Sequence, residues 1–281
     1  MSESTSNPSA KDPKRRSQRD EDEQRKQPVL YSVRGATAVI TLDSPYNRNA
    51  ISPGLVEGLR AGLRAAESDP DVRSVRLEHT GPAFCAGADL RAVGTSPEAQ
   101  RDSTAAVADL LEAMLVHPKP IVAVITGHVR AGGMGLAACA DAVFAGPRAT
   151  FGLSEVRIGV APALVSAVVM PRLLPRAGSR WLLGGEAVPS DDAAAAGFIT
   201  ESCEDPSAAA DQLEAAFAAS APGAMAETRK LVNAEALNRL REQRQDLLDL
   251  SVRLFMSAEA AAGLRAFNRK QPPPWQTASS S

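Results

Sequence analysis

Two glycine-containing segments in the first half of the sequence could together bind one negatively charged oxygen. They are Ala83–Leu90 (AFCAGADL) and Gly127–Gly135 (GHVRAGGMG). Small residues at a turn let a backbone N–H approach a ligand atom closely. The second segment leads into an Ala- and Leu-rich stretch, which predicts a helix beginning at Gly132, where N–H groups lack intrahelical partners and the helix dipole favours negative charge. Two such donors on one oxygen would form an oxyanion hole, an arrangement suited to acyl or enolate chemistry.

The composition argues against a nucleic-acid-binding, disulfide-rich, membrane-spanning or secreted protein. A chain of 281 residues can bury a sizeable core, and its net charge of −2 gives no basic field for nucleic acid. Its cysteines, Cys85, Cys139 and Cys203, are odd in number and show no regular spacing, so we expect a reducing, cytoplasmic setting without a disulfide framework. No apolar run is long enough to cross a membrane, and the N-terminus lacks the order of a secretory signal.

Composition also divides the chain into three parts. Residues 1–27 are polar with mixed charge, and we expect a disordered tail because so little apolar area can be buried. Its basic cluster Lys14-Arg15-Arg16 could contact nucleic acid or a membrane, but acidic residues follow directly and favour a solvated tail. Residues 28–206 are predicted to form an α/β core, and residues 207–281 a helical region.

Strands and helices are predicted to alternate through the core. Buried strands are expected at 37–42, 72–77, 121–125, 142–145 and 151–158, and helices after Ser52, over 98–116 and after the second glycine segment. Such alternation is typical of α/β folds with mainly parallel sheets.

The region after Ser207 carries a stripe of leucines at helical spacing, formed by Leu237, Leu240, Leu247 and Leu254. The stripe could pack on the core of the same chain. A terminal helical layer of this length favours instead a contact with neighbouring subunits.

Several segments together resemble one known family. Ala83–Leu90, Ala123–Asp141 and Phe151–Pro162 are similar to the three signature segments of the enoyl-CoA hydratase/isomerase (crotonase) superfamily. Asn49-Ala50-Ile51 resembles the Asn-Ala-Leu element of that family, and Glu259–Lys270 its C-terminal segment. These motifs occur in the family's order, and the resemblance runs from about Val33 to Trp275.

The resemblance implies an architecture and a substrate. The fold would be a crotonase-type spiral of repeated ββα units (the ClpP/crotonase fold) with a C-terminal helical trimerisation region. The assembly would be a homotrimer or a dimer of trimers. The substrate would be an acyl-CoA thioester, so coenzyme A is part of the substrate and no separate cofactor is expected. His79, His117 and His128 are scattered in the sequence, so we expect no metal site. The charge and the short apolar runs likewise lead us to expect no nucleic acid and no membrane as partners.

The resemblance also assigns roles to single residues. The backbone N–H groups of Ala86 and Gly132 match the two donors to the thioester oxygen. Glu155 matches a catalytic glutamate, whose pKa burial would raise toward neutrality. The alternative for Glu155 is a strand-end carboxylate paired with Arg157. The positions that match CoA-binding residues are Arg48, Ala86, Gly87, Ala88, Asp89, Leu90, Phe267 and Lys270.

Three positions depart from the family's pattern. Gly135 stands where many hydratases have another glutamate, and Ala163–Ala167 stands where a glycine-rich stretch is common. Arg130 replaces an apolar residue, and could hold an acidic acyl tail or point to solvent. We therefore expect hydration of a 2-enoyl-CoA with the single glutamate Glu155, with Δ3,Δ2-enoyl-CoA isomerisation or non-catalytic acyl-CoA binding as the alternatives.

Overall fold

The computed structural model describes residues 27–88 and 96–276. The tail predicted for residues 1–27 therefore falls almost entirely outside the described residues. The same is true of Asp89 and Leu90, which the resemblance assigns to CoA binding. Within the described ranges, no helix is both long and apolar enough to cross a membrane.

Two sheets form the centre of the molecule. The larger sheet is parallel except between its first two strands, and the smaller sheet is parallel except at its last pair. The larger sheet has the order β1 (Val29–Arg34), β2 (Thr37–Leu42), β3 (Ser74–His79), β5 (Ile121–Ile125), β7 (Ala142–Ala145) and β10 (Glu201–Ser202). The smaller sheet has the order β4 (Ala83–Cys85), β6 (His128–Arg130), β8 (Thr150–Gly152) and β9 (Val188–Pro189). Strands β1, β4, β6, β9 and β10 were not predicted from the sequence.

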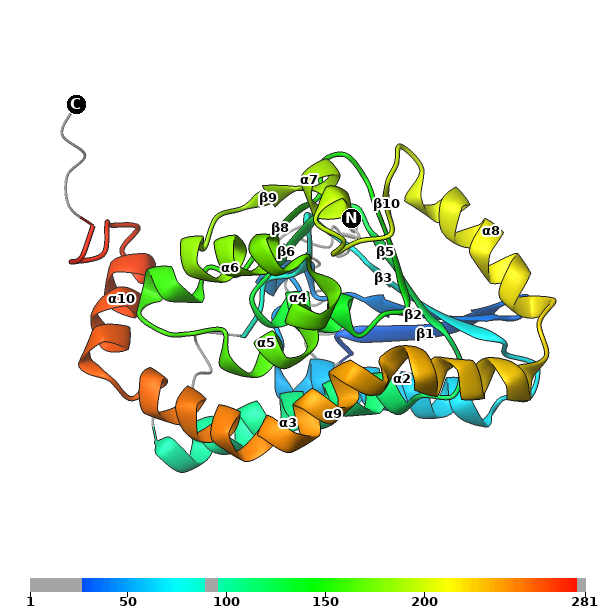
Figure 1. Cartoon of the computed structure of the whole chain (residues 1–281), viewed down its shortest axis with the longest axis horizontal. Helices are drawn as coiled ribbons and strands as arrows, with labels where there is room; N and C mark the ends of the chain where they lie inside the picture. The colour runs from blue at the N-terminus through cyan, green and yellow to red at the C-terminus, as the bar shows by residue number, and fades with distance from the viewer. Residues whose placement is uncertain (1–26, 89–95, 277–281) are drawn as a thin grey trace, which may run out of the picture.

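Helices cover the larger sheet on both faces (Figure 1). Helices α2, α3 and α9 form a layer on one face, α8 lies across the other, and α10 sits at the far end of the molecule from α8. The helices are α2 (Pro53–Ser68), α3 (Pro97–Val116), α4 (Gly132–Ala138), α5 (Ala163–Val169), α6 (Pro175–Gly184), α7 (Ser190–Ala195), α8 (Pro206–Ala218), α9 (Pro222–Phe255) and α10 (Ala258–Asn268). The single-turn 3₁₀ helices are η1 (Pro45–Asn47), η2 (Glu155–Ile158) and η3 (Met170–Arg172).

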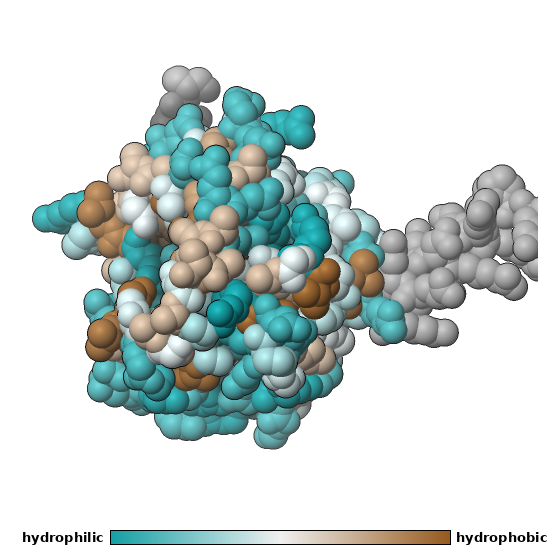
Figure 2. All heavy atoms as spheres, turned by 90° about the vertical axis from the view of Figure 1, so that its right-hand side faces the viewer, coloured by the Kyte–Doolittle hydropathy of each residue, from teal (hydrophilic) through white to brown (hydrophobic). Residues whose placement is uncertain are grey.

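Strand β5 is apolar on both of its faces. Ile121 and Ile125 belong to the main core, whereas Val122 and Val124 belong to a second, smaller core that includes Ala210 of α8. A strand covered on both sides needs apolar residues at every position. The outer face at the α8 end is mostly hydrophilic, with separate hydrophobic patches (Figure 2).

Helix α2 follows the signals read from its sequence. Ser52 caps the helix, accepting the N–H of Leu55 at 3.3 Å, and proline occupies its first turn. Leu55, Leu59 and Leu63 are buried at helical spacing. The predicted helix start at Ser52 is confirmed.

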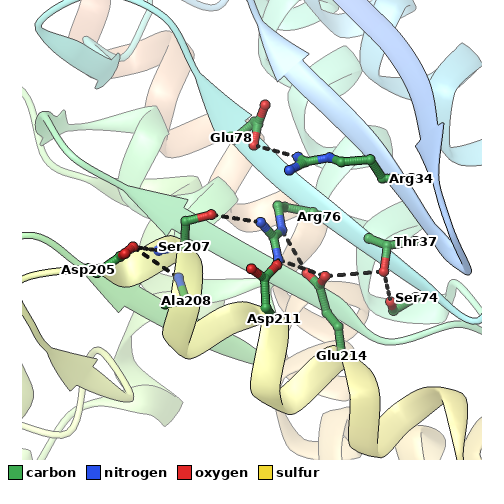
Figure 3. Close-up of polar contacts among 10 residues, drawn as sticks. All are labelled: Arg34, Thr37, Ser74, Arg76, Glu78, Asp205, Ser207, Ala208, Asp211 and Glu214. Atoms are coloured by element: carbon green, nitrogen blue, oxygen red, sulfur yellow. Dashed lines mark hydrogen bonds and ion pairs between the residues drawn. The ribbon is translucent and has the colours of Figure 1, made fainter.

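A buried ion pair fixes α8 to the sheet (Figure 3). Arg76 of β3 is 1% exposed and donates to both carboxylate oxygens of Glu214, at 2.8 and 2.7 Å. Asp211 and Ser207 of α8 accept further hydrogen bonds from the guanidinium, at 2.5 and 3.0 Å. Thr37 donates to Glu214 at 3.1 Å, so both ends of the pair are hydrogen-bonded.

A second arginine fixes α9 to the carboxyl end of α3. Arg229 donates to the carbonyl oxygens of Met114 and Leu115, at 2.7 and 3.0 Å, and to that of His117. It also pairs with Asp141 at 2.7 Å. The guanidinium therefore satisfies carbonyl groups that the end of a helix leaves without partners.

The leucine stripe of α9 packs within its own chain. Leu240 is fully buried, and Leu237 and Leu247 pack against the main core. Helix α9 contacts α3 and α5 along its length. The core therefore supplies a surface for these leucines, while Leu254 belongs to neither core cluster. The expected contact of the stripe with a neighbouring subunit stays a prediction. The predicted trimer rests on the family resemblance alone.

Candidate active site

Three adjacent parallel strands bring the predicted site segments to one edge of the smaller sheet. Cys85 of β4 pairs with Val129 of β6, and Val129 pairs with Phe151 of β8. Gly87 of the first segment, Gly132 of the second and Glu155 each follow the carboxyl end of one of these strands. Ligands of open α/β sheets bind at this edge.

The two glycine segments are in direct contact. Gly87 has a φ of 87°, and a Cβ added there would lie 2.6 Å from the Ala131 Cβ and 3.3 Å from the Gly132 nitrogen. A Cβ added at Gly133 would lie 2.7 Å from the Cys85 carbonyl oxygen. No side chain fits between the segments, which is the close approach that their small residues predict. Gly132 is the first residue of α4, as predicted.

Ala131 holds a strained backbone at this contact. Its φ of 49° and ψ of −119° lie in a region that glycine favours and alanine rarely adopts. Such a conformation costs on the order of 1–3 kcal/mol and persists only where the surroundings enforce it. Its N–H donates to Gly152 at 3.0 Å and its carbonyl accepts from Met134 at 2.9 Å, which holds the turn in place.

The buried side chain of Asn49 fixes the loop after η1. Its Oδ1 accepts the N–H of Ser44 at 2.7 Å, and its Nδ2 donates to the carbonyl oxygens of Thr80 and Ala83, at 3.1 and 2.8 Å. Arg48 and Asn49 both adopt positive φ, 60° and 53°. This element of the family motif thus positions the backbone beside β4.

Ala86 is engaged by the same loop. Its N–H donates to the carbonyl oxygen of Arg48 at 3.0 Å. A thioester oxygen would have to share this N–H or replace the Arg48 carbonyl. The Gly132 N–H, by contrast, occupies the first position of α4, where no intrahelical acceptor exists. Sequence reasoning missed the Ala86–Arg48 bond because nothing local marks a contact between separate loops.

Glu155 lies on a 3₁₀ turn, not on a strand. Strand β8 ends at Gly152, and Glu155 begins η2. Gly159, with a φ of 81°, ends the turn and donates its N–H to the Glu155 carbonyl. The predicted strand over 151–158 is therefore wrong beyond Gly152, because this glycine closes a turn that an extended chain would not form.

One oxygen of the Glu155 carboxylate, Oε2, is buried without a hydrogen-bond partner. Burial raises the pKa of Glu155 to about 7, and a hydrogen bond from its own backbone lowers the pKa only in part. Arg157 donates instead to the carbonyl of Gly184, at 3.1 and 3.3 Å. The alternative of a Glu155–Arg157 pair is therefore wrong, and the carboxyl group can exchange protons near neutral pH.

A family model agrees with this arrangement over most of the chain. The model described as enoyl-CoA hydratase/isomerase matches residues 33–278. The chain belongs to the enoyl-CoA hydratase/isomerase family.

Relatives and solved structures agree with the assignment. The chain is 30% identical over 256 residues to an enoyl-CoA hydratase of Mycobacterium tuberculosis, covering 88% of this chain and 96% of that protein. It is 42% identical to the crystal structure of an enoyl-CoA hydratase from Mycobacterium avium, with a TM-score of 0.84 and coverage of 89% and 99%. A carnitinyl-CoA hydratase structure from Mycobacterium avium gives 27% identity, a TM-score of 0.75 and coverage of 89% and 98%. The predicted crotonase fold is confirmed, including the C-terminal helical region.

Within this family, Gly135 of α4 faces an apolar wall. A Cβ added there would lie 3.1 Å from Cγ1 of Val165 and 3.4 Å from both Cδ atoms of Leu111. Val165 lies in the Ala163–Ala167 segment, which also departs from the family's pattern. The two departures therefore meet in space. Hydrocarbon occupies the surroundings of the position where many hydratases of this family carry a second carboxylate.

Arg130, the third departure from the enoyl-CoA hydratase/isomerase pattern, connects β6 to β8. Its guanidinium donates to the carbonyl oxygens of Val129 and Thr150, at 2.8 and 2.7 Å, and to the Thr150 hydroxyl at 2.7 Å. Burial lowers its pKa. The guanidinium of Arg130 thus forms hydrogen bonds within the smaller sheet. The sequence left open two other roles, binding an acidic acyl tail or pointing to solvent, and neither describes this arrangement.

The residues that match the family's CoA-binding positions fall into two groups. Gly87 and Ala88 belong to the first glycine segment, which Arg48 contacts through the Ala86 N–H, and Ala88 pairs with Ile51 in a parallel bridge. Phe267 and Lys270 are exposed at the carboxyl end of α10. The part that each residue takes in CoA binding stays a prediction.

Proposed function

We propose that this protein adds water to the double bond of a 2-enoyl-CoA thioester, with Glu155 as its single acid/base group. The observation that carries the proposal is the buried Oε2 of Glu155, which makes no hydrogen bond and lies on the turn after β8, the strand beside those that carry the two glycine segments. A pKa of about 7 matches the pH at which a group can both accept and donate a proton. The family supports the class of substrate.

The reaction balances with one carboxylate. Glu155 takes a proton from water as the hydroxyl oxygen bonds to the β-carbon, and the electron pair of the double bond moves toward the thioester oxygen. The N–H groups of Ala86 and Gly132 would stabilise that charge, with Ala86 giving up or sharing its bond to Arg48. Glu155 then delivers the proton to the α-carbon and returns to its carboxylate form.

Substrate recognition follows the family's pattern in this proposal. CoA is part of the substrate, so the reaction needs no resident cofactor. Arg48, Gly87, Ala88, Phe267 and Lys270 would contact the CoA moiety. A homotrimer or a dimer of trimers, and a cytoplasmic setting, belong to the same proposal.

The wall beside Gly135 favours a second candidate, Δ3,Δ2-enoyl-CoA isomerisation. The side-chain atoms nearest to this position belong to Val165 and Leu111, and these hydrocarbon groups cannot orient a water molecule. Isomerisation needs no water, because Glu155 takes a proton from the α-carbon of a 3-enoyl-CoA and returns it to the γ-carbon. The oxyanion donors would stabilise the dienolate between the two transfers.

One experiment separates these functions. Purified wild-type protein and Glu155→Gln are incubated with panels of 2-enoyl-CoA and 3-enoyl-CoA thioesters, and the products are resolved by chromatography. Glu242→Gln is the matched control, since Glu242 is an exposed glutamate on α9. We expect 3-hydroxyacyl-CoA from the wild type and the control. We expect about 10²- to 10⁴-fold less from Glu155→Gln, because general acid/base catalysis is lost.

The other products decide the alternatives. Conversion of 3-enoyl-CoA to 2-enoyl-CoA without a hydroxyacyl product would replace hydration by isomerisation. Tight binding of the thioesters without any product would leave a non-catalytic binder. Full activity of Glu155→Gln would overturn the assignment of Glu155 in either reaction.

A further inference from the structure

Helix α10 packs directly on the 3₁₀ turn that begins at Glu155. A Cβ added at Gly263 of α10 would lie 2.3 Å from the carbonyl oxygen of Ile158 and 2.5 Å from its carbonyl carbon. A Cβ added at Gly159 would lie 2.8 Å from the carbonyl carbon and oxygen of Glu259. Neither position accepts a side chain without displacing backbone.

This contact is connected to Glu155 through the backbone. The N–H groups of Gly159 and Val160 both donate to the carbonyl oxygen of Glu155, the second at 3.1 Å. On the other side of the contact, Ser257 caps α10 by accepting the N–H of Ala260 at 3.0 Å. A displacement of α10 would therefore move Gly159 and, through its hydrogen bond, the backbone of Glu155.

We propose that α10 positions the Glu155 carboxylate, and that Gly159 and Gly263 are positioning residues for its proton transfer. The inference rests on the proposed function of Glu155. Ala260 and Ala266 are buried one turn to either side of Gly263 and leave the helix backbone free to approach the turn. In this proposal, the close packing of α10 keeps the turn in place and keeps the Oε2 atom of Glu155 buried.

Helix propensity alone predicts the opposite effect at Gly263. Glycine inside a helix is less favourable than alanine, so Gly263→Ala would stabilise an isolated α10. The close contact with Ile158 predicts instead that the added methyl group pushes α10 and η2 apart. The sign of the effect therefore distinguishes a contact across α10 from a property of the helix itself.

The main experiment compares Gly263→Ala with Gly223→Ala in the full chain. Gly223 lies in the first turn of α9, and a Cβ added there meets nothing within 4 Å. We expect kcat of Gly263→Ala to fall about 10- to 100-fold, because small misplacements of a reacting group cost this much. The KM for the thioester should change little, since the first glycine segment is untouched. Gly223→Ala should behave as the wild type.

The pH profile gives a readout that a purely structural role would not move. Burial holds the pKa of Glu155 at about 7, so a carboxylate exposed to water should titrate at a lower pH. The midpoint of the rise of kcat/KM with pH should therefore move down in Gly263→Ala. The charged groups on the turn and on α10, Arg157, Glu259 and Arg265, are exposed and unchanged by the substitution.

A second variant covers the case in which Gly263→Ala does not fold. Ser257→Ala removes the cap of α10 beside the contact with Gly159, and leaves every glycine in place. We expect a smaller fall in kcat and the same downward shift of the profile. Hydrogen exchange at the amides of Gly159 and Val160, measured by NMR, should become faster in both variants, independently of any activity.

The outcomes are distinct. Wild-type kcat and pH profile in folded Gly263→Ala or in Ser257→Ala, with an inactive Glu155→Gln, would overturn the positioning role and leave the proposed function standing. Faster exchange with unchanged kcat would also overturn it, because the contact would then hold the turn without positioning the carboxylate. An active Glu155→Gln would instead overturn the proposed function.

Discussion

Two glutamates of this chain have buried carboxylate oxygens but differ in the hydrogen-bond partners of those oxygens. Glu214 on α8 is 7% exposed and accepts hydrogen bonds from Arg76 and Thr37, so both of its oxygens have partners (Figure 3). Glu155 on η2 has a buried Oε2 with no partner. A buried carboxylate with a bidentate arginine is a structural pair. A carboxylate with one buried oxygen that makes no hydrogen bond is available for a proton or a ligand, which distinguishes Glu155 from Glu214.

The largest effect should come from Glu155→Gln. We expect about 10²- to 10⁴-fold lower kcat with no loss of stability, because the amide removes a base and also an unsatisfied buried charge. The measurement is steady-state kinetics beside urea unfolding. A stability loss comparable to that of Glu214→Gln would show that the two sites do not differ in kind.

Glu214→Gln should show the reverse pattern. The amide leaves the buried Arg76 charge with only the exposed Asp211 as an acidic partner. We expect the free energy of unfolding to fall by about 3 kcal/mol, the low end for breaking a buried pair, because Asp211 remains. The kcat of the folded fraction should equal that of the wild type. A large kcat defect in folded Glu214→Gln would contradict the separation of the two roles.

The pH dependence of stability should reveal Glu155 specifically. Its pKa in the folded protein, about 7, lies above the ordinary value of 4.5, so folding favours the protonated form. This stabilisation is complete below pH 4.5 and is lost as the pH rises through 7. The difference in unfolding free energy between the wild type and Glu155→Gln should therefore fall by about 2–3 kcal/mol over this range.

Unfolding in urea at several pH values measures that difference. The partly buried His79 and the buried His117, whose pKa values are lowered by desolvation, contribute equally to both proteins and cancel. A difference that stays constant with pH would mean that Glu155 titrates near its ordinary pKa.

The smallest effect should come from a paired but exposed glutamate. Glu57 and Arg64 of α2 form an ion pair of 2.8 Å with side chains that are 70% and 59% exposed. Glu57→Gln should change the free energy of unfolding by about 0.5 kcal/mol or less, since water and salt screen the pair. Thermal unfolding at two salt concentrations checks this. A change as large as that of Glu214→Gln would mean that pairing matters without burial.

Local signals in the sequence predicted much of the fold. The cap at Ser52, the β-branched run Ile121–Ile125 and the apolar run Ala142–Ala145 identify their elements, because each element meets its main requirement within a few residues. Strand β1 was missed because five of its six residues are exposed and show no alternation of buried and exposed positions. Strand β6 is only three residues long, too short for a periodic signal.

The residues of the candidate site could be predicted from the sequence, but the contacts between them could not. The resemblance located Glu155 and both glycine segments, and the structure brings those segments together. The Ala86–Arg48 hydrogen bond, the wall of Val165 and Leu111 at Gly135, and the packing of Gly263 on η2 each join distant parts of the chain. No local pattern encodes these contacts, because each depends on how whole elements pack.

The guanidinium of Arg229 has a consequence for synthesis on the ribosome. The carbonyl oxygens of Met114 and Leu115, at the end of α3, obtain this partner only from residue 229, which follows them by 115 and 114 positions. While the chain is growing, these groups have only solvent to bind. The nascent core therefore stays incomplete until most of the polypeptide has emerged. A chain released before residue 229 lacks the guanidinium that binds the end of α3.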